Sequence, residues 1–194
     1  MTVILDSAVA RSRGVRWAIA GISAGVLAAD QVTKSLVVAG RIPDGSSLGW
    51  LTVIVIRNHG ATAGIGSGYP VLVALLVLAL TALAAGLTVR ATSRAAALCL
   101  AAVVGGALGN LSDRILRSPG LGRGGVVDWI HFSCGGGSFD LADLALLFGV
   151  LGAMAAMAVA WRARKGRKRE EPAPTPQPQC PPAPCSPGHP IAAT

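Results

Sequence analysis

Apolar and polar residues alternate along this chain in long blocks. Four blocks are apolar for most of their length, and we expect them to form helices at 15–38, 70–89, 95–116 and 139–161. A helix needs roughly 20 predominantly apolar residues to cross a bilayer, so each block is long enough to span one. The pattern therefore predicts an all-α membrane domain with four transmembrane helices between residues 15 and 161.

The first block also has features of a cleaved signal peptide. Basic residues precede it, and the small residues Ala28 and Ala29 lie near its end. However, the apolar character resumes after Lys34, and three more apolar blocks follow. We therefore expect an uncleaved first transmembrane helix, preceded by a short cytoplasmic segment at 1–14.

The segments outside the apolar blocks predict a small sheet and a disordered tail. Residues 40–69 contain the β-branched run TVIVI, followed by the turn-forming Asn58-His59-Gly60. We expect a small external sheet there, lying over the helix ends. Residues 162–194 are first basic and then rich in proline, a composition that cannot build an apolar core. They predict a disordered cytoplasmic tail.

Charge placement predicts the orientation in the membrane. Basic residues cluster in three segments at the ends of apolar blocks, namely 11–16, 89–94 and 162–168. Cytoplasmic loops carry an excess of Lys and Arg, so all three segments are expected inside the cell. Both termini are then cytoplasmic, and the segments 40–69 and 117–138 lie on the external side.

Composition excludes several classes of protein. The chain is 52% hydrophobic and 13% charged, with a mean hydropathy of +0.58, which is too apolar for an ordinary soluble domain. The net charge of +8 could favour nucleic acid, but aromatic residues are few and the basic residues lie at segment ends. We expect no nucleic-acid partner. The four cysteines form no CxxC pair and have no metal-ligand spacing, so we expect no metal and no cofactor.

The predicted topology brings polar residues from separate segments to one depth near the external face. Ionisable groups at such positions are expensive in a membrane and are usually functional. They come from the first, third and fourth helices: Asp30, Lys34, Asn110, Asp113, Arg114, Asp140 and Asp143. This convergence predicts a site at the external helix ends.

Paired aspartates suggest acid–base chemistry on water. Asp128 lies between Val127 and Trp129, where poor solvation raises its pKa, and Asp143 lies one turn inside the fourth helix. If the two face each other, the ionised one can accept a proton from water while the neutral one donates to a carbonyl oxygen. Asp140 and Asp143 are a rival pair, although neighbours on one helix are less suited to clamping a peptide bond.

The remaining polar residues also have structural interpretations. Asp30 and Lys34, four residues apart, can pair on one helix face or contact a ligand. Asp113 and Arg114 fit a buried network that braces a neighbouring segment. Each of these residues therefore has two open roles.

Three other features also have a structural or an open role. Gly105 and Gly109 form a GxxxG pattern, for which close helix packing is the expected role. His59 lies in a glycine-rich turn with no accompanying nucleophile motif, so it is a weak candidate for a base. His131 follows the Asp128 segment, and its role stays open.

Five motifs follow one another in a specific order: DQVTK (30–34), RNHGATAGI (57–65), GGALGNLSDR (105–114), VVDWI (126–130) and FDLAD (139–143). In sequence and spacing they resemble the lipoprotein signal peptidases (signal peptidase II), the membrane aspartic proteases of bacteria. The resemblance implies four transmembrane helices with an external β-cradle. It also implies cleavage of prolipoproteins before a diacylglyceryl-modified cysteine, in the bacterial cytoplasmic membrane near its external face.

The resemblance further implies a role for individual residues. Asp128 and Asp143 would form the catalytic dyad. Ten more residues would bind the substrate or brace the site: Asp30, Lys34, Asn58, Gly60, Ala61, Asn110, Asp113, Arg114, Asp140 and Ala142. The expected partners are prolipoprotein substrates and membrane lipid, and we expect a monomer.

The chain departs from the family pattern at a few positions. Asp140 stands where the family usually has asparagine, and Ala63 stands where it usually has an aromatic residue. The loop from Arg117 to Gly125 is longer than usual. These departures leave both dyad residues in place.

A small proton- or cation-coupled transporter is the alternative class. Acidic residues within a membrane can relay protons or bind cations. Against this alternative, no charge lies near the middle of a predicted span, and no inverted repeat is visible. A purely structural scaffold would leave the aspartates on separate segments unexplained.

Overall fold

The computed structural model describes residues 12–133 and 135–170 of the 194-residue chain. Its helices are α2 (Arg13–Val38), the short 3₁₀ helix η1 (Thr62–Gly64), α3 (Pro70–Arg90), α4 (Arg94–Leu116) and α5 (Leu141–Glu170). Its strands are β1 (Ser47–Leu48), β2 (Leu51–Asn58), β3 (Val126–Phe132) and β4 (Ser138–Phe139). Most of the predicted N-terminal segment 1–14, and the proline-rich part of the predicted tail, lie outside the described residues.

Helix α4 is the centre of the helical bundle and contacts α2, α3 and α5. Its glycines permit this close packing. A Cβ atom at Gly105 would collide with the backbone of Ser23 on α2, and one at Gly109 would collide with the Asp30 carboxylate. The packing role predicted for the GxxxG pattern is confirmed.

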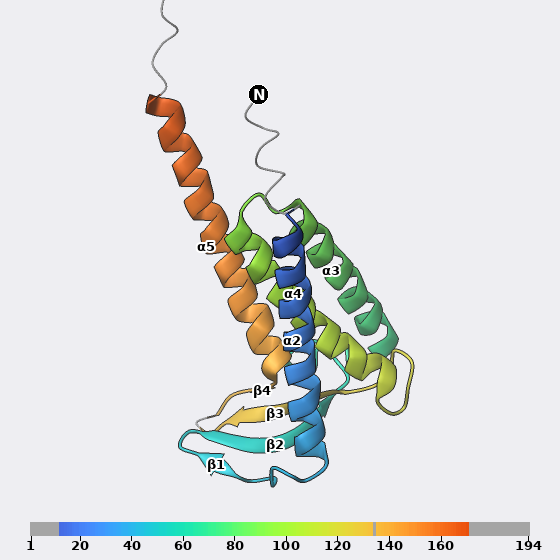
Figure 1. Cartoon of the computed structure of the whole chain (residues 1–194). Helices are drawn as coiled ribbons and strands as arrows, with labels where there is room; N and C mark the ends of the chain where they lie inside the picture. Colours follow the sequence, from blue (N-terminus) through green and yellow to red (C-terminus); the bar gives the residue numbers. More distant parts are fainter. Residues whose placement is uncertain (1–11, 134, 171–194) are drawn as a thin grey trace, which may run out of the picture.

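The four strands form one antiparallel sheet in the order β1-β2-β3-β4, which lies across one end of the bundle (Figure 1). Strand β2 contains the predicted TVIVI run, so the small sheet is confirmed. The prediction placed the sheet within residues 40–69, but half of its strands come from residues 126–139. The VVDWIHF segment is a short apolar run. Hydropathy alone did not identify it as a strand, because such a run lacks the alternation of apolar and polar residues that marks one.

Three helices are long and apolar enough to cross a membrane: α3, α4 and the Leu141–Lys165 part of α5. Helix α2 has 26 residues, but it carries Arg13, Arg16, Asp30 and Lys34 and is not among the three. The chain is thus a mostly helical membrane protein with a small antiparallel sheet.

The fourth predicted helix differs from the expectation at both ends. It begins at Leu141, because Ser138 and Phe139 form β4 and Asp140 precedes the first turn. It continues to Glu170, so residues 162–170 extend the helix and do not begin a disordered tail. Arginine and lysine dominate this extension, and both favour helix.

The ends of the helices fall into two groups. The start of α2, the junction between α3 and α4, and the Glu170 end of α5 lie at the end of the bundle opposite the sheet (Figure 1). The described basic residues of the segments 12–16, 89–94 and 162–168 therefore belong to one end of the bundle, and the sheet lies at the other.

Candidate active site

Three carboxylates meet at the sheet end of the bundle. Asp128 lies on β3, Asp140 lies between β4 and α5, and Asp143 is in the first turn of α5. An oxygen atom from each lies within 4.8 Å of the other two. The structure therefore brings together both the predicted pair and its rival, Asp140.

Asp128 is almost completely buried, with 5% of its surface exposed. Burial raises its pKa to about 6, and the nearby negative charge of Asp143 acts in the same direction. A hydrogen bond from Asn58 opposes this rise. Asp128 therefore changes its protonation state much closer to neutral pH than an ordinary aspartate does.

Asn58 directs its amide group at Asp128. Its Nδ2 donates to Asp128 Oδ2 at 3.3 Å and to the Ala61 carbonyl oxygen at 3.1 Å. Its Oδ1 accepts from the Gly60 backbone N–H at 3.0 Å. Because the oxygen is held by a backbone donor, the NH₂ group must face the carboxylate.

Asn110 is oriented toward Asp143 in the same manner. Its Oδ1 accepts from Lys34 Nζ at 3.1 Å, and its Nδ2 donates to Asp143 Oδ1 at 3.2 Å. Lysine can only donate, so this contact fixes the amide with its NH₂ group on Asp143. Each member of the predicted dyad thus has its own oriented asparagine.

Lys34 is the positive centre of the site. Its Nζ lies 2.8 Å from Asp30, 2.9 Å from Asp113 and 2.6 Å from Asp140, and none of these side chains has any exposed surface. Sequence spacing predicted only the pair with Asp30. A buried charge has to be paired, which explains why the chain tolerates a lysine here.

Asp140 has two structural contacts. Its Oδ1 accepts from the Asp143 backbone N–H at 2.8 Å, which caps the start of α5. Its Oδ2 contacts Lys34. Burial raises the pKa of Asp140 to about 7, whereas the charge of Lys34 acts in the opposite direction.

The other two partners of Lys34 also hold the backbone beside the predicted dyad. Asp113 Oδ2 accepts from the Val127 N–H at 3.2 Å, one residue before Asp128. Asp30 Oδ1 accepts from the Ala142 N–H at 3.1 Å, one residue before Asp143. Asp30 and Asp113 therefore position the two segments that carry the dyad.

Arg114 holds the turn that follows β2. Its guanidinium donates to the Gly60 carbonyl oxygen at 2.5 Å and to the His59 carbonyl oxygen at 3.4 Å. Gly60 is required in this turn, because a Cβ atom would collide with the backbone of Gly64 and Ile65. Through Gly60 and Asn58, this turn reaches Asp128.

Ala142 is completely buried, and its Cβ atom lies in the part of the α4–α5 contact occupied by Gly109. A larger side chain at this position would push α5 away from α4. Ala142 therefore acts through packing in this structure. Ala61 contributes its backbone carbonyl, as described above.

The two candidate histidines make contacts away from the acidic cluster. His59 Nδ1 lies 3.1 Å from the Arg123 carbonyl oxygen, and His131 Nδ1 lies 3.1 Å from the Ser138 hydroxyl across β3 and β4. Both therefore connect loops or strands.

The predictions missed two contributors. Gln31 Nε2 donates to Asp30, to the Gly109 carbonyl oxygen and to Asp113, and Arg117 Nε lies 2.5 Å from Asp113. A glutamine inside a predicted span was a usable signal, because such a polar group needs partners in lipid.

By distance alone, the cluster of Asp128, Asp140 and Asp143 could offer one oxygen ligand each to a hard divalent cation. Lys34 already places a positive charge against Asp140. The oriented asparagines direct hydrogen-bond donors at the other two carboxylates. The arrangement is therefore suited to holding protons between carboxylates in a poorly solvated site.

Comparison with known proteins agrees with the geometry. The signal peptidase (SPase) II family matches residues 22–159 of the chain. A lipoprotein signal peptidase of Streptomyces griseus subsp. griseus is 38% identical over 149 residues, which cover 74% of this chain and 76% of that protein. One from Streptomyces coelicolor is 40% identical over 103 residues, covering 52% of this chain.

The match to the Streptomyces coelicolor protein spans about half of that relative, 48% of its length. A solved structure of a bacterial membrane enzyme has a TM-score of 0.62 and 25% sequence identity to this chain. That match covers 80% of this chain and 94% of the solved one. The overall fold is therefore similar to that of a solved membrane enzyme.

Proposed function

The chain belongs to the signal peptidase II family, and on that premise we propose that it is an aspartic endopeptidase that removes signal peptides from prolipoproteins. Cleavage would occur before the diacylglyceryl-modified cysteine. The observation that carries the aspartic assignment is the meeting of Asp128 and Asp143 from separate elements, each with its own oriented asparagine.

We infer that the two carboxylates share one proton before reaction. The burial and mutual repulsion that raise the pKa of Asp128 favour this state. The ionised carboxylate accepts a proton from water, whose oxygen attacks the peptide carbonyl carbon, while the neutral one donates its proton to the carbonyl oxygen. Collapse of the tetrahedral intermediate breaks the C–N bond, and the departing amine takes up a proton from the dyad.

Asp140 is the weaker candidate for the chemistry. One of its oxygens caps α5, and the other contacts Lys34. Asp128 and Asp143 each receive a side-chain hydrogen bond from an asparagine instead of an ion pair. We therefore assign Asp140 a positioning role beside the dyad.

The remaining predicted site residues support this dyad. Asp30, Lys34 and Asp113 fix α5 and β3 relative to each other, and Asn110 connects Lys34 to Asp143. Arg114 holds the turn that carries Gly60. We therefore infer positioning roles for these charged residues, which would leave the dyad free to contact substrate.

The membrane orientation follows from charge. We propose that α2 is a fourth span, because Asp30 and Lys34 are buried against α4 and α5 and are not exposed to lipid. The basic helix ends would face the cytoplasm, and the sheet would lie on the external face. The dyad is then at the surface where exported prolipoproteins emerge, with their lipid in the bilayer.

The transporter alternative has no support from the comparisons. The relatives described above are named as lipoprotein signal peptidases. The acidic residues of the site lie at the sheet end of the bundle and not at its middle.

The direct test is incubation of the purified protein with a lipid-modified prolipoprotein, followed by mass spectrometry of the product. Wild-type protein should release the signal peptide immediately before the modified cysteine. Asp128→Asn and Asp143→Asn should each abolish cleavage while remaining folded. Asp44→Asn removes a carboxylate from an exposed loop and is the matched control; it should retain normal turnover. Normal turnover by either dyad variant would refute the assignment.

A further inference from the structure

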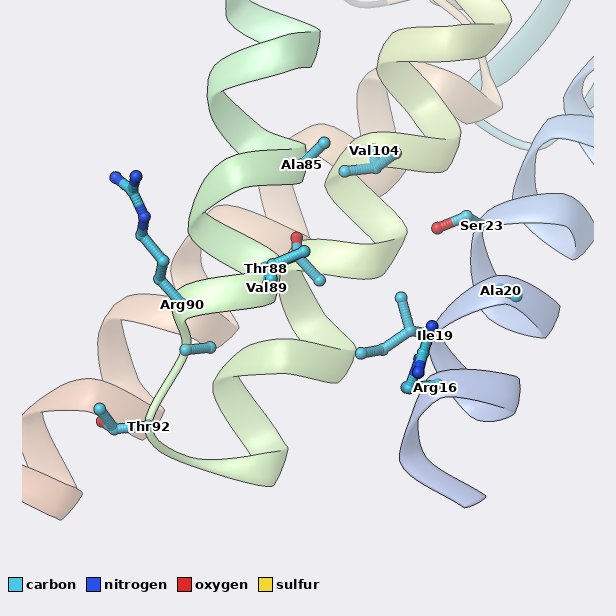
Figure 2. A pocket seen from close by; sticks show the side chains of 11 residues that line it. Arg16, Ile19, Ala20, Ser23, Ala85, Thr88, Val89, Arg90, Thr92 and Val104 are labelled. Atoms are coloured by element: carbon cyan, nitrogen blue, oxygen red, sulfur yellow. The ribbon is translucent and has the colours of Figure 1, made fainter. Parts of the chain in front are cut away.

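A large cavity opens between α2, α3 and α4 at the end of the bundle opposite the sheet. Its volume is about 750 Å³. In Figure 2, Ile19 and Ser23 of α2 face Thr88 and Val104 across it, and Arg16 lies one turn nearer the helix end. None of the acidic residues discussed above lies among its lining residues, so the proposed peptidase chemistry does not use it.

The cavity combines an apolar wall with a positive rim. Ala20, Ala85, Val89 and Val104 supply apolar surface, and Arg16 lies at the level of the basic helix ends. Ser23 and Thr88 use their hydroxyl hydrogens for backbone carbonyls, so their polarity is satisfied within the helices. No acidic residue lines the cavity among the residues that the structure describes. The rim therefore has a positive charge that is not neutralised locally.

The basic field at this end has several contributors. Arg90 also lines the cavity wall, although its guanidinium extends away from the opening along α3 (Figure 2). Arg13 and Arg94 begin α2 and α4 close by. In the parts of the chain that the structure covers, none of these four arginines forms an ion pair. An anionic group at the rim would provide the missing counter-charge.

The cavity extends from the headgroup level to about the middle of the bilayer. Helix α3 has 21 residues, which is about 31 Å of helix and close to the roughly 30 Å thickness of the hydrocarbon core. Arg90 ends this helix and therefore lies at the headgroup level. Val104 lies ten residues beyond Arg94 on α4, about 15 Å deeper into the bilayer. An occupant would have a polar group at the rim and an apolar chain below it.

We propose that this cavity binds an anionic phospholipid from the leaflet on the basic side, with its phosphate near Arg16 and an acyl chain along α2, α3 and α4. Basic pockets between transmembrane helices on this side are suited to such headgroups. The volume is within the range of about 300–1,000 Å³ that is typical of sites for small ligands. This binding function goes beyond the proposed peptidase activity and does not rest on it.

The test uses the full chain purified in detergent, with native mass spectrometry as the measurement of retained lipid. Phosphatidylglycerol and phosphatidylcholine with identical acyl chains are compared. They differ only in the headgroup and its net charge, so a difference in retention separates the effect of the headgroup from that of chain burial. Inorganic phosphate is a third probe that lacks the acyl chain. We expect retention of one phosphatidylglycerol at concentrations where phosphatidylcholine and phosphate are not retained.

Two variants separate the charge from the cavity. Arg16→Gln should lower the affinity for phosphatidylglycerol about fivefold, the effect of losing one basic side chain near an anionic lipid. Ala85→Trp leaves every charge in place but fills the cavity, and it should abolish retention. Arg162→Gln removes an exposed arginine from α5 outside the cavity and is the matched control. It should bind as wild type does.

Equal retention of phosphatidylcholine would overturn the proposal, as would full retention by Ala85→Trp. A loss in Arg162→Gln equal to that in Arg16→Gln would show attraction to the general charge of this end and would also overturn it. Thermal unfolding without added lipid confirms that each variant is folded before binding is measured. Because lipid retention is read without substrate, failure here is independent of failure in the peptidase assay.

Discussion

Replacement of Lys34 by methionine tests whether the buried ionic network holds the site together. The substitution keeps a long flexible side chain and removes the one positive charge that contacts all three of Asp30, Asp113 and Asp140; Asp113 alone keeps a second basic partner, Arg117. Those carboxylates lie 2.6–2.9 Å from Nζ and have no exposed surface. Removing one partner of a buried ion pair typically costs about 3–5 kcal/mol, because the remaining charges stay buried without compensation.

The same substitution should also abolish cleavage. Asn110 would lose the donor that holds its oxygen, so its NH₂ group would no longer be fixed on Asp143. The free energy of unfolding can be measured from tryptophan fluorescence during denaturation in detergent. Peptide cleavage is then measured at a temperature where the variant is still folded.

A second substitution, at Asp140, tests whether the lost stability comes from unpaired carboxylates. Adding Asp140→Asn to Lys34→Met removes one of the carboxylates that lost its Lys34 partner and retains an oxygen that can cap α5. The double variant should regain stability, with a coupling energy of about 0.5–3 kcal/mol. Lys165→Met removes an exposed lysine that lies 5.2 Å above the Trp161 ring and should cost no more than about 1 kcal/mol, the value of an exposed cation–π contact. Wild-type stability in Lys34→Met, or a less stable double variant, would refute the network.

Four other outcomes are expected. Activity should fall as the pH drops through about 6, because the raised pKa of Asp128 leaves the dyad fully protonated below it; an acidic limb near pH 4 in the pH–rate profile would contradict this. Gly109→Ala should cost about 1–3 kcal/mol by overpacking against Asp30, whereas Gly86→Ala, which meets no neighbouring atom, should be neutral or stabilising in the same unfolding assay. Truncation after Arg169 should preserve cleavage, because the site lies upstream; an inactive but folded truncation would oppose this. EDTA should have little effect on turnover, and inhibition that zinc reverses would indicate a metal enzyme.

The sequence predicted the fold correctly wherever an apolar block extends over many residues. The helices at 70–90 and 94–116 were predicted to within one residue, and TVIVI was correctly placed in a sheet. The β3 segment was not identified as a strand, because a short apolar run with one aspartate has no distinctive period. The start of α5 was misplaced for a similar reason, since Phe139 is as apolar as the helix that follows.

The sequence predicted which residues gather at the candidate site, but not most of the contacts between them. Charge placement indicated that the acidic residues converge at one depth, and the structure places Asp128 and Asp143 together. Spacing along a helix indicated the contact between Lys34 and Asp30. It could not indicate the contacts with Asp113 and Asp140, because those partners are far away in sequence and meet only through helix packing.

These contacts explain how the chain accommodates Asp140 where the family usually has asparagine. A carboxylate oxygen can cap α5 as an amide oxygen can, so the cap is compatible with either residue. The ion pair with Lys34 is specific to the carboxylate. The Ala63 departure concerns a side chain that lies outside the described part of the structure.

The distribution of Lys34's partners along the chain has a consequence for biosynthesis. Asp30 is made four residues before Lys34, so α2, the fourth span proposed above, would enter the bilayer with these two charges already paired. Asp113 and Asp140 emerge from the ribosome 79 and 106 residues after Lys34, and Asp143 comes after both. A partly synthesised chain therefore has Asp128 without Asp143. The proposed hydrolytic site would be completed only when the last helix is made, so an unfinished copy would not cut its neighbours in the membrane.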